Sequence, residues 1–102
     1  MNANPMSRAT ILALLQQHRE VIAARFGAPH LALFGSAARD EMRDDSDIDV
    51  LVDFHGPASF DRYFDLKDYL EQVLDRSVDL VTRKGLKPRA LQHVERDLVR
   101  VA

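Results

Sequence analysis

The chain has 102 residues, of which 46% are hydrophobic and 29% charged, with a formal net charge of −2 and no cysteine. This length suits one domain with a modest core, and the charge argues against a surface devoted wholly to nucleic acid. The lack of cysteine excludes disulfides and thiolate metal sites. No apolar run approaches the roughly 20 residues that span a bilayer, so we expect a cytoplasmic protein without membrane contact.

The N-terminal part of the chain predicts one long helix. Ser7 suits the N-cap of a helix over residues 8–26, and Gly27 suits its C-terminal stop. Residues 1–7 are expected to form a flexible tail, so that residues 8–102 make up a single domain. The apolar residues of this helix recur at helical spacing and are expected to face the core: Ile11, Leu12, Leu15, Val21, Ile22 and Phe26.

The rest of the chain alternates strands and helices. We expect, in chain order, a strand over 30–34, one or two helical turns over 36–42, a turn over 44–46, a strand over 48–54, a helix over 60–75 capped by Ser59, a strand over 78–82, a helix over 88–97 and an extended tail. The expected inward side chains of the second long helix are Phe60, Tyr63, Phe64, Leu70, Val73 and Leu74, with Tyr69 at the surface.

This order of elements predicts an α/β fold with a small mixed three-stranded sheet packed with helices. Alternation of strands and helices ordinarily indicates a parallel sheet. The link between the first two strands, however, has only about a dozen residues, which is near the minimum for a parallel crossover. A mixed sheet is therefore at least as compatible with the sequence as a parallel one.

Two carboxylates stand at the start of the second strand. Asp47 and Asp49 are two residues apart, so they project to one face of a strand. A divalent cation relieves their repulsion most simply, and Mg²⁺ takes carboxylate oxygens while keeping water and phosphate as other ligands. The simpler alternative is a solvated acidic turn.

A third carboxylate stands second in the strand VDLVT. Asp79 lies beside the Asp47–Asp49 pair if its strand neighbours residues 48–54. Three carboxylates suit two Mg²⁺ ions that clamp the attacking and leaving oxygens of a phosphoryl or nucleotidyl transfer. Asp79 would then be nearest to the incoming hydroxyl and is a candidate to accept its proton.

A candidate phosphate site precedes the carboxylates. Gly35 ends the first strand and allows close approach of a ligand to the backbone. The helical turn that starts at Ser36 offers free N–H groups, which favour an anion, and the Ser36 hydroxyl adds another hydrogen bond. Arg39 is expected to hold this turn against Asp47 or to meet a phosphate oxygen.

These residues together resemble the minimal nucleotidyltransferases of the DNA polymerase β superfamily. That family's signature is Gly-Ser, ten residues, then Asp-x-Asp, with a third Asp on a later strand. Here Gly35-Ser36 is followed by residues 37–46 and then by Asp47-Ile48-Asp49, and Arg39 and the run from Ser46 to Leu51 also match. The resemblance covers about residues 8–98. One departure is Asp40, where glycine is common in the family. Two interpretations stay open: its carboxylate weakens nucleotide binding at the nearby phosphate site, or it faces solvent.

The resemblance implies a polymerase β palm-like core and a nucleotidyl transfer in which an acceptor attacks the α-phosphate of ATP and pyrophosphate leaves. It implies that Asp47 and Asp49 hold two Mg²⁺ ions, with Asp79 helping to hold the catalytic one. It also implies that Gly35 and Ser36 bind the triphosphate, and Arg39 and Ser46 are included in the nucleotide site. The family's small members are typically encoded beside a helical HEPN-domain protein and act as its antitoxin.

The known chemistry of those members is transfer of AMP to a tyrosine hydroxyl of the HEPN toxin. Only 23 residues follow Asp79, too few for an acceptor-binding domain, so we expect a HEPN partner or a homodimer mate to supply acceptor recognition. Two alternatives remain open. One is a non-catalytic module that neutralises its partner by covering it, and the other is transfer to a small molecule or an RNA end.

The last part of the chain is locally basic. An excess of cations over Glu95 and Asp97 is interpreted first as a solvated helix. Contact with ATP phosphates, an acidic partner or RNA stays open as an alternative, with Lys87 and Arg89 as the candidates to meet phosphate. Nucleic acid is not the expected partner. The cations of this segment are Arg83, Lys84, Lys87, Arg89, Arg96 and Arg100.

Overall fold

The computed structural model describes residues 6–57 and 59–101, so most of the expected N-terminal tail lies outside the described residues. The elements in chain order are α1 (Arg8–Gln17), α2 (Arg19–Phe26), β1 (His30–Phe34), α3 (Gly35–Ala38), β2 (Ile48–Asp53), α4 (Phe60–Leu74), β3 (Val78–Thr82), α5 (Pro88–Arg96) and β4 (Val99–Arg100). In the described part of the chain, no helix has the length and apolar character needed to cross a membrane.

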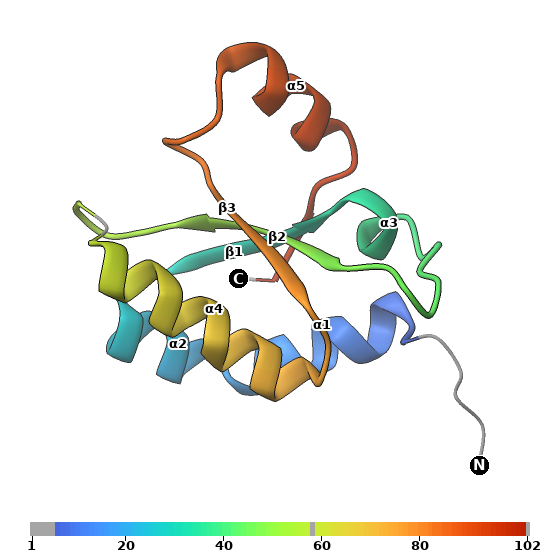
Figure 1. Ribbon diagram of the computed structural model, residues 1–102, viewed down its shortest axis with the longest axis horizontal. Helices are drawn as coiled ribbons and strands as arrows, with labels where there is room; N and C mark the ends of the chain where they lie inside the picture. Colours follow the sequence, from blue (N-terminus) through green and yellow to red (C-terminus); the bar gives the residue numbers. More distant parts are fainter. Residues whose placement is uncertain (1–5, 58, 102) are drawn as a thin grey trace.

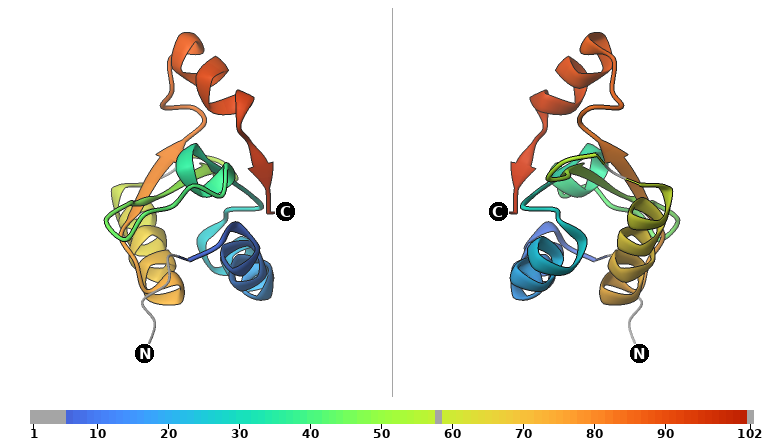
Figure 2. Two further views of the ribbon diagram at one scale, coloured as in Figure 1. Left: turned by 90° about the vertical axis from the view of Figure 1, so that its right-hand side faces the viewer. Right: turned by 90° about the vertical axis from the view of Figure 1, so that its left-hand side faces the viewer.

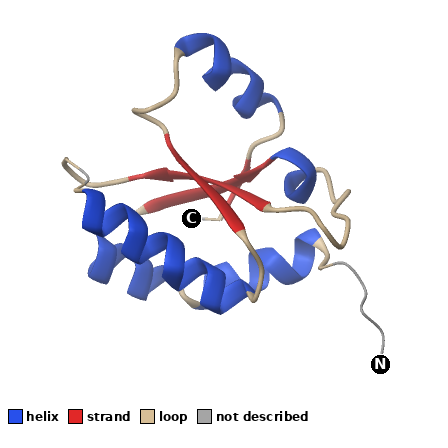
Figure 3. Cartoon of the chain, in the orientation of Figure 1, coloured by secondary structure: helices blue, strands red, loops and turns tan. Residues whose placement is uncertain are grey.

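The four strands form one mixed sheet in the order β3-β2-β1-β4 (Figure 3). Strand β1 runs antiparallel to β2 and β4, whereas β2 runs parallel to β3. The prediction of a mixed α/β sheet is therefore confirmed. The sheet gains a fourth strand because the expected extended tail pairs with β1, with Arg100 opposite Ala32.

Helices α1, α2 and α4 lie against one face of the sheet, and α5 stands on the opposite side (Figures 1 and 2). The central strand β2 buries Ile48, Val50 and Val52 completely toward the helical layer. Because side chains alternate along a strand, Asp49 and Asp53 project from the other face. The packing of the core thus fixes which way the β2 carboxylates point.

The prediction of one helix over residues 8–26 is wrong, because the helix is interrupted at His18. The backbone of His18 leaves the helical region, and its Nδ1 is hydrogen-bonded to the Tyr69 hydroxyl at 2.7 Å. Tyr69, which was expected at the surface, is half-buried and packs against Phe26. The predicted apolar residues Ile11, Leu15, Ile22 and Phe26 are buried, whereas Val21 lies about 100° around the helix from Ile22 and is 44% exposed.

The cap of α4 agrees with the prediction, but its inward face is different. The Ser59 hydroxyl accepts a hydrogen bond from the Arg62 N–H at 3.1 Å. Leu66, Leu70 and Leu74 form the fully buried stripe of this helix, and the predicted inward residues Phe60 and Phe64 are 80% and 48% exposed. At about 100° per residue, Phe60 and Phe64 lie about 80° and about 120° around the helix from Leu70, the middle residue of the buried stripe. Tyr63 is only half-buried.

Candidate active site

Asp49 and Asp79 are direct neighbours on the face of the sheet opposite α1, α2 and α4. Asp49 on β2 is in register with Asp79 on the parallel strand β3. The side chain of Asp49 is half-buried and that of Asp79 is exposed at the sheet edge. The expectation that the third carboxylate lies beside the pair is thus met for Asp49.

Burial and like charge together raise the pKa of Asp49 to about 6. Burial is the largest cause, followed by the charge of Asp79, a hydrogen bond between the two carboxyl groups and the charge of Asp47. Arg39 acts in the opposite direction from a greater distance. Negative charge is therefore concentrated here, and no ion pair to Asp49 is found among residues 6–57 and 59–101.

Gly35 lies directly against Asp49. Its φ of +65° falls in the left-handed region, and a Cβ on Gly35 would collide with the Asp49 carboxylate. Phe34, the residue before it, is in register with Asp49 across the β1–β2 pair. The end of β1 therefore places the start of α3 beside the carboxylates, where only glycine fits.

Helix α3 is a single turn, shorter than the predicted residues 36–42. The Ser36 hydroxyl donates a weak hydrogen bond to Met42 Sδ at 3.6 Å, and the Ser36 carbonyl accepts from the Glu41 N–H at 2.8 Å. The backbone of the Gly-Ser turn is thus held in place by the residues that follow α3.

Arg39 does not pair with Asp47, which corrects one of its two predicted roles. Its guanidinium forms ion pairs at 2.8 Å with Glu41 and with Asp97, the residue after α5. The second ion pair brings Asp97, just after α5, to the residue that follows α3. Arg39 therefore ties the start of the candidate site to the C-terminal helix, and its predicted contact with phosphate stays a prediction.

Asp40 faces away from the Gly-Ser turn. Its φ of +59° explains why glycine is favoured at this position. The Asp40 carboxylate accepts a hydrogen bond from the Arg8 N–H at 2.8 Å, and the Arg8 guanidinium donates to the Ala38 carbonyl at 2.9 Å. Asp40 thus caps the start of α1.

Arg76 holds the loop before Asp47, and sequence analysis did not identify it. Its guanidinium donates to the carbonyls of Arg43, Asp44 and Ser46 at 2.7, 2.8 and 3.2 Å. The Ser46 hydroxyl in turn accepts from the Arg43 N–H at 3.0 Å. A lone arginine after a helix gives no sequence signal of this role.

Asp47 is exposed and lines a separate open hollow of about 550 Å³ with Ser46 and Arg76. No three His, Asp or Glu side chains of residues 6–57 and 59–101 converge closely enough to hold a metal ion. The structure thus brings Asp49 and Asp79 together, and Asp47 would have to turn toward them to complete a three-carboxylate site. Paired carboxylates without a neutralising cation nonetheless have the donor chemistry that Mg²⁺ prefers.

A mixed sheet that presents paired aspartates beside a Gly-Ser turn is the arrangement of a nucleotidyl-transferring enzyme, and comparison with known proteins agrees. The nucleotidyltransferase domain family matches residues 15–101, so the chain belongs to this family and is a nucleotidyltransferase.

Similar proteins cover nearly the whole chain. The protein adenylyltransferase MntA of Thermococcus cleftensis is 38% identical over 91 residues, which cover 89% of this chain and 92% of that protein. MJ1379 of Methanocaldococcus jannaschii, provisionally named a protein adenylyltransferase, is 37% identical over 94 residues, covering 89% and 94% of the two chains.

Solved structures share the fold. One described provisionally as a minimal nucleotidyltransferase has a TM-score of 0.79 and 37% identity, covering 92% of this chain and 95% of that one. A toxin–antitoxin complex with AMP-PNP contains a chain with a TM-score of 0.69 at 23% identity, covering 95% of this chain and 73% of that one. The second likeness concerns the fold alone.

Proposed function

We propose that this chain transfers AMP from ATP, with Mg²⁺, to a tyrosine hydroxyl of a partner HEPN toxin in the cytoplasm, and thereby acts as the antitoxin. The observation that carries the proposal is the Asp49–Asp79 pair beside Gly35. The names of the relatives add support, because 89% of this chain aligns with each of two proteins named as protein adenylyltransferases, one of them provisionally. A structure with the same fold contains a tri-AMPylated HEPN toxin bound to an MNT antitoxin.

The three aspartates would hold the metal. Asp49 and Asp79 contribute carboxylate oxygens from adjacent strands, and Asp47 directly precedes the first residue of β2. Bound Mg²⁺ supplies charge stabilisation for the phosphates during transfer. The high local negative charge gives these side chains reason to take up a cation, since the charge of each neighbour already raises the pKa of Asp49.

Gly35 and Ser36 would bind the triphosphate beside these carboxylates. Gly35 leaves room because it has no side chain, and the Ser36 hydroxyl can turn from Met42 to a phosphate oxygen, which is a stronger acceptor than sulfur. Ser46 and Arg39 are the other candidates for the nucleotide site, and each would contact nucleotide only after giving up a present hydrogen bond.

Asp79 would receive the proton of the acceptor. It is exposed on the edge strand β3, where a hydroxyl of another protein can approach. The tyrosine O–H gives its proton to the Asp79 carboxylate, the tyrosine oxygen bonds to the α-phosphorus, and the bond to the leaving pyrophosphate breaks. The products are the AMP–tyrosine ester and pyrophosphate.

Intact-mass analysis tests the proposal. The HEPN-domain product of the gene adjacent to this chain's own gene would be incubated with the chain, ATP and Mg²⁺. We expect the mass of that product to rise by one or more AMP units with the wild-type chain and to stay unchanged with the Asp47→Asn, Asp49→Asn variant. A stable complex without any mass gain would contradict AMP transfer.

The alternative of a non-catalytic binding module has lost the residue that favoured it. Asp40 caps α1 and does not point at the phosphate site, so it gives no reason to expect impaired nucleotide binding. Neutralisation of the toxin by the Asp47→Asn, Asp49→Asn variant would nevertheless favour this alternative over catalysis.

A further inference from the structure

Helix α4 presents an unusual apolar surface to solvent. Phe60 and Phe64 stack with their ring centroids 5.5 Å apart and their planes 17° from parallel. With Val21 on α2, they are the large hydrophobic side chains that the described part of the chain leaves exposed. Phe60, Phe64, Tyr63 and Thr82 line a shallow hollow of about 350 Å³. Two stacked phenylalanines are a costly surface feature unless another surface covers them.

The neighbouring edge of the sheet is partly capped by hydrogen bonds within the chain. The Ser77 carbonyl and the Arg83 N–H are hydrogen-bonded to β2. The backbone groups of the alternate residues Val78, Leu80 and Thr82 therefore point away from β2, toward the open edge of the sheet. The Val78 N–H donates to the Glu71 carboxylate at 2.9 Å, and the Leu80 carbonyl accepts from the Tyr63 hydroxyl.

The Thr82 carbonyl accepts from the Gly85 N–H at 3.1 Å, within a turn. Side chains of α4 and this turn therefore protect the edge strand. A partner at this edge is expected to bind through side chains on α4 rather than as an additional strand.

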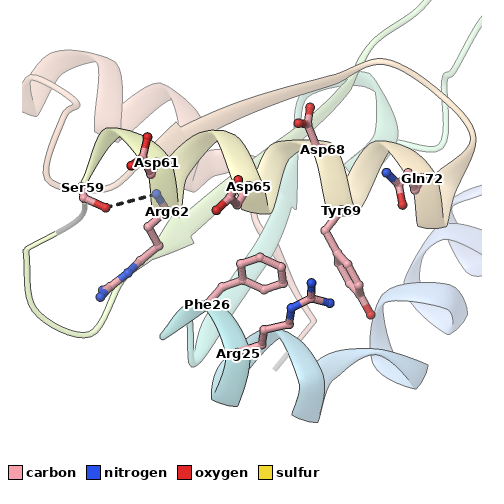
Figure 4. A pocket seen from close by; sticks show the side chains of 9 residues that line it. All are labelled: Arg25, Phe26, Ser59, Asp61, Arg62, Asp65, Asp68, Tyr69 and Gln72. Carbon is pink, nitrogen blue, oxygen red and sulfur yellow. Dashed lines mark hydrogen bonds between the residues drawn. The ribbon is translucent and has the colours of Figure 1, made fainter.

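An acidic row flanks the aromatic pair along α4. The side chains of Asp61, Asp65 and Asp68 line a hollow of about 610 Å³ between α4 and α2 (Figure 4). Two arginines also line this hollow and keep their positive charge, so the carboxylates of Asp61, Asp65 and Asp68 exceed the cations there by one. Arg25 lies over the rings of Phe26 and Tyr69, and the Arg62 guanidinium donates to the His55 carbonyl at 3.4 Å.

This surface adjoins the candidate active site. The hydrogen bond from Tyr63 to Leu80 holds the first turn of α4 next to the residue that follows Asp79. Asp79, which is in register with Asp49, lies on the edge strand β3. The Phe60–Phe64 pair lies on α4, the helix that packs against this strand. A protein seated on α4 reaches Asp79 by extending over the β3 edge.

We propose that Phe60 and Phe64, together with Asp61, Asp65 and Asp68, form the docking surface for the acceptor protein. The proposal rests on the proposed function. The partner surface carries an apolar anchor that covers the phenylalanine pair and Lys or Arg side chains that enter the acid-lined hollow. Charge complementarity steers such a partner, and the aromatic pair supplies the buried anchor.

A second copy of this chain is a poorer occupant. Pairing of two α4 helices around Phe60 and Phe64 would bring Asp61 and Asp65 of each copy close to the same residues of the other. Like charges opposed across an interface disfavour association. The acidic row thus favours a basic partner over self-association.

Isothermal titration calorimetry with the adjacent-gene HEPN-domain protein tests the proposal. One double variant carries Phe60→Ser and Phe64→Ser, and the other carries Asp61→Lys and Asp65→Lys. Val21→Ser is the matched control, because Val21 is as exposed as Phe64 but lies on α2. We expect the affinity to fall at least 30-fold for each double variant and to stay within twofold for Val21→Ser. Binding of ATP and Mg²⁺ is expected to stay within twofold of wild type for all of them.

The outcomes separate this proposal from the proposed function. Wild-type affinity of the Phe60→Ser, Phe64→Ser variant, or no binding by the wild-type chain, would overturn the docking surface. Self-association that this variant abolishes, measured by analytical ultracentrifugation, would assign the surface to a second copy and overturn the proposal as well. A complex that depends on Phe60 and Phe64 but never gains AMP would support the docking surface while contradicting AMP transfer.

Discussion

Gly35 and Asp49 are in close contact, because the Asp49 carboxylate occupies the space that a side chain at position 35 would need. The contact joins the two halves of the candidate site, because Gly35 opens α3 and Asp49 lies on β2. The spacing between the Gly-Ser pair and the aspartates therefore has a geometric cause. The antiparallel β1–β2 pair brings the end of one strand back to the start of the next.

Substitution of Gly35 by alanine tests this contact. The new Cβ would collide with the Asp49 carboxylate and would also occupy the left-handed region. We expect the free energy of unfolding to fall by about 3 kcal/mol, measured by urea denaturation, and AMP transfer to be lost.

Gly56→Ala is the matched control, because Gly56 has a φ of +80° but no atom near the position of its Cβ. It is expected to cost about 1 kcal/mol and to leave transfer intact. Equal losses of stability in the two variants would show that backbone strain, not the carboxylate, accounts for glycine at position 35.

Replacement of Asp49 by asparagine should separate stability from activity. The variant removes a half-buried charge that lies beside Asp79 and near Asp47. We expect the metal-free protein to become more stable, by about 1 kcal/mol after allowance for solvent screening, and transfer to be abolished. Thermal unfolding in EDTA gives the first quantity and intact-mass analysis the second.

Asp53→Asn is the control for that experiment. Asp53 projects from the same face of β2 but pairs with Arg83 at 3.0 Å, so its replacement is expected not to stabilise the protein. A lower melting temperature for Asp49→Asn than for wild type in EDTA would contradict the crowding of charge described above.

The sequence predicted those parts of the fold that local patterns determine. Apolar runs bounded by turn residues located β1 and β3 at their observed bounds and β2 to within one residue. The structure adds the direction of Asp49, because burial of Ile48 and Val50 leaves only the opposite face of β2 for its side chain. Local pattern was sufficient wherever the nearest neighbours in sequence decide the conformation.

Features that depend on distant partners could not be predicted in this way. The break at His18 depends on Tyr69, 51 residues later, and the orientation of Arg39 depends on Asp97, 58 residues later. The exposure of Phe60 and Phe64 follows from the rotation of α4 against the sheet, which is set by the leucine stripe. This helix has more apolar residues than its buried face holds, so the sequence pattern did not show which of them face outward.

Arg76 is expected to position Asp47 through the loop before it. Arg76→Lys retains the charge, but its side chain is shorter than the one that brings Nη2 to the carbonyls of Arg43, Asp44 and Ser46. We expect a loss of about 1–2 kcal/mol in stability and at least a tenfold loss in the rate of transfer. Arg19→Lys, at an exposed position of α2, serves as control and is expected to change neither. Wild-type transfer by Arg76→Lys would rule out this positioning role.

Glu71 should make the stability of the protein depend on pH. The hydrogen bond from the Val78 N–H is the main cause that lowers the pKa of Glu71; burial opposes it and Lys67 assists it. A lowered carboxyl pKa stabilises the fold above the unfolded value, about 4.3, and this contribution is lost as the pH falls through the folded value. We therefore expect Glu71→Gln to be less stable than wild type at pH 7, with the difference shrinking as the pH falls below about 4.

Urea denaturation from pH 3 to 7 measures this difference in stability, with the exposed Asp68→Asn on the same helix as control. A difference between Glu71→Gln and wild type that is constant over this range would mean that the ionised carboxylate does not hold the β3 edge.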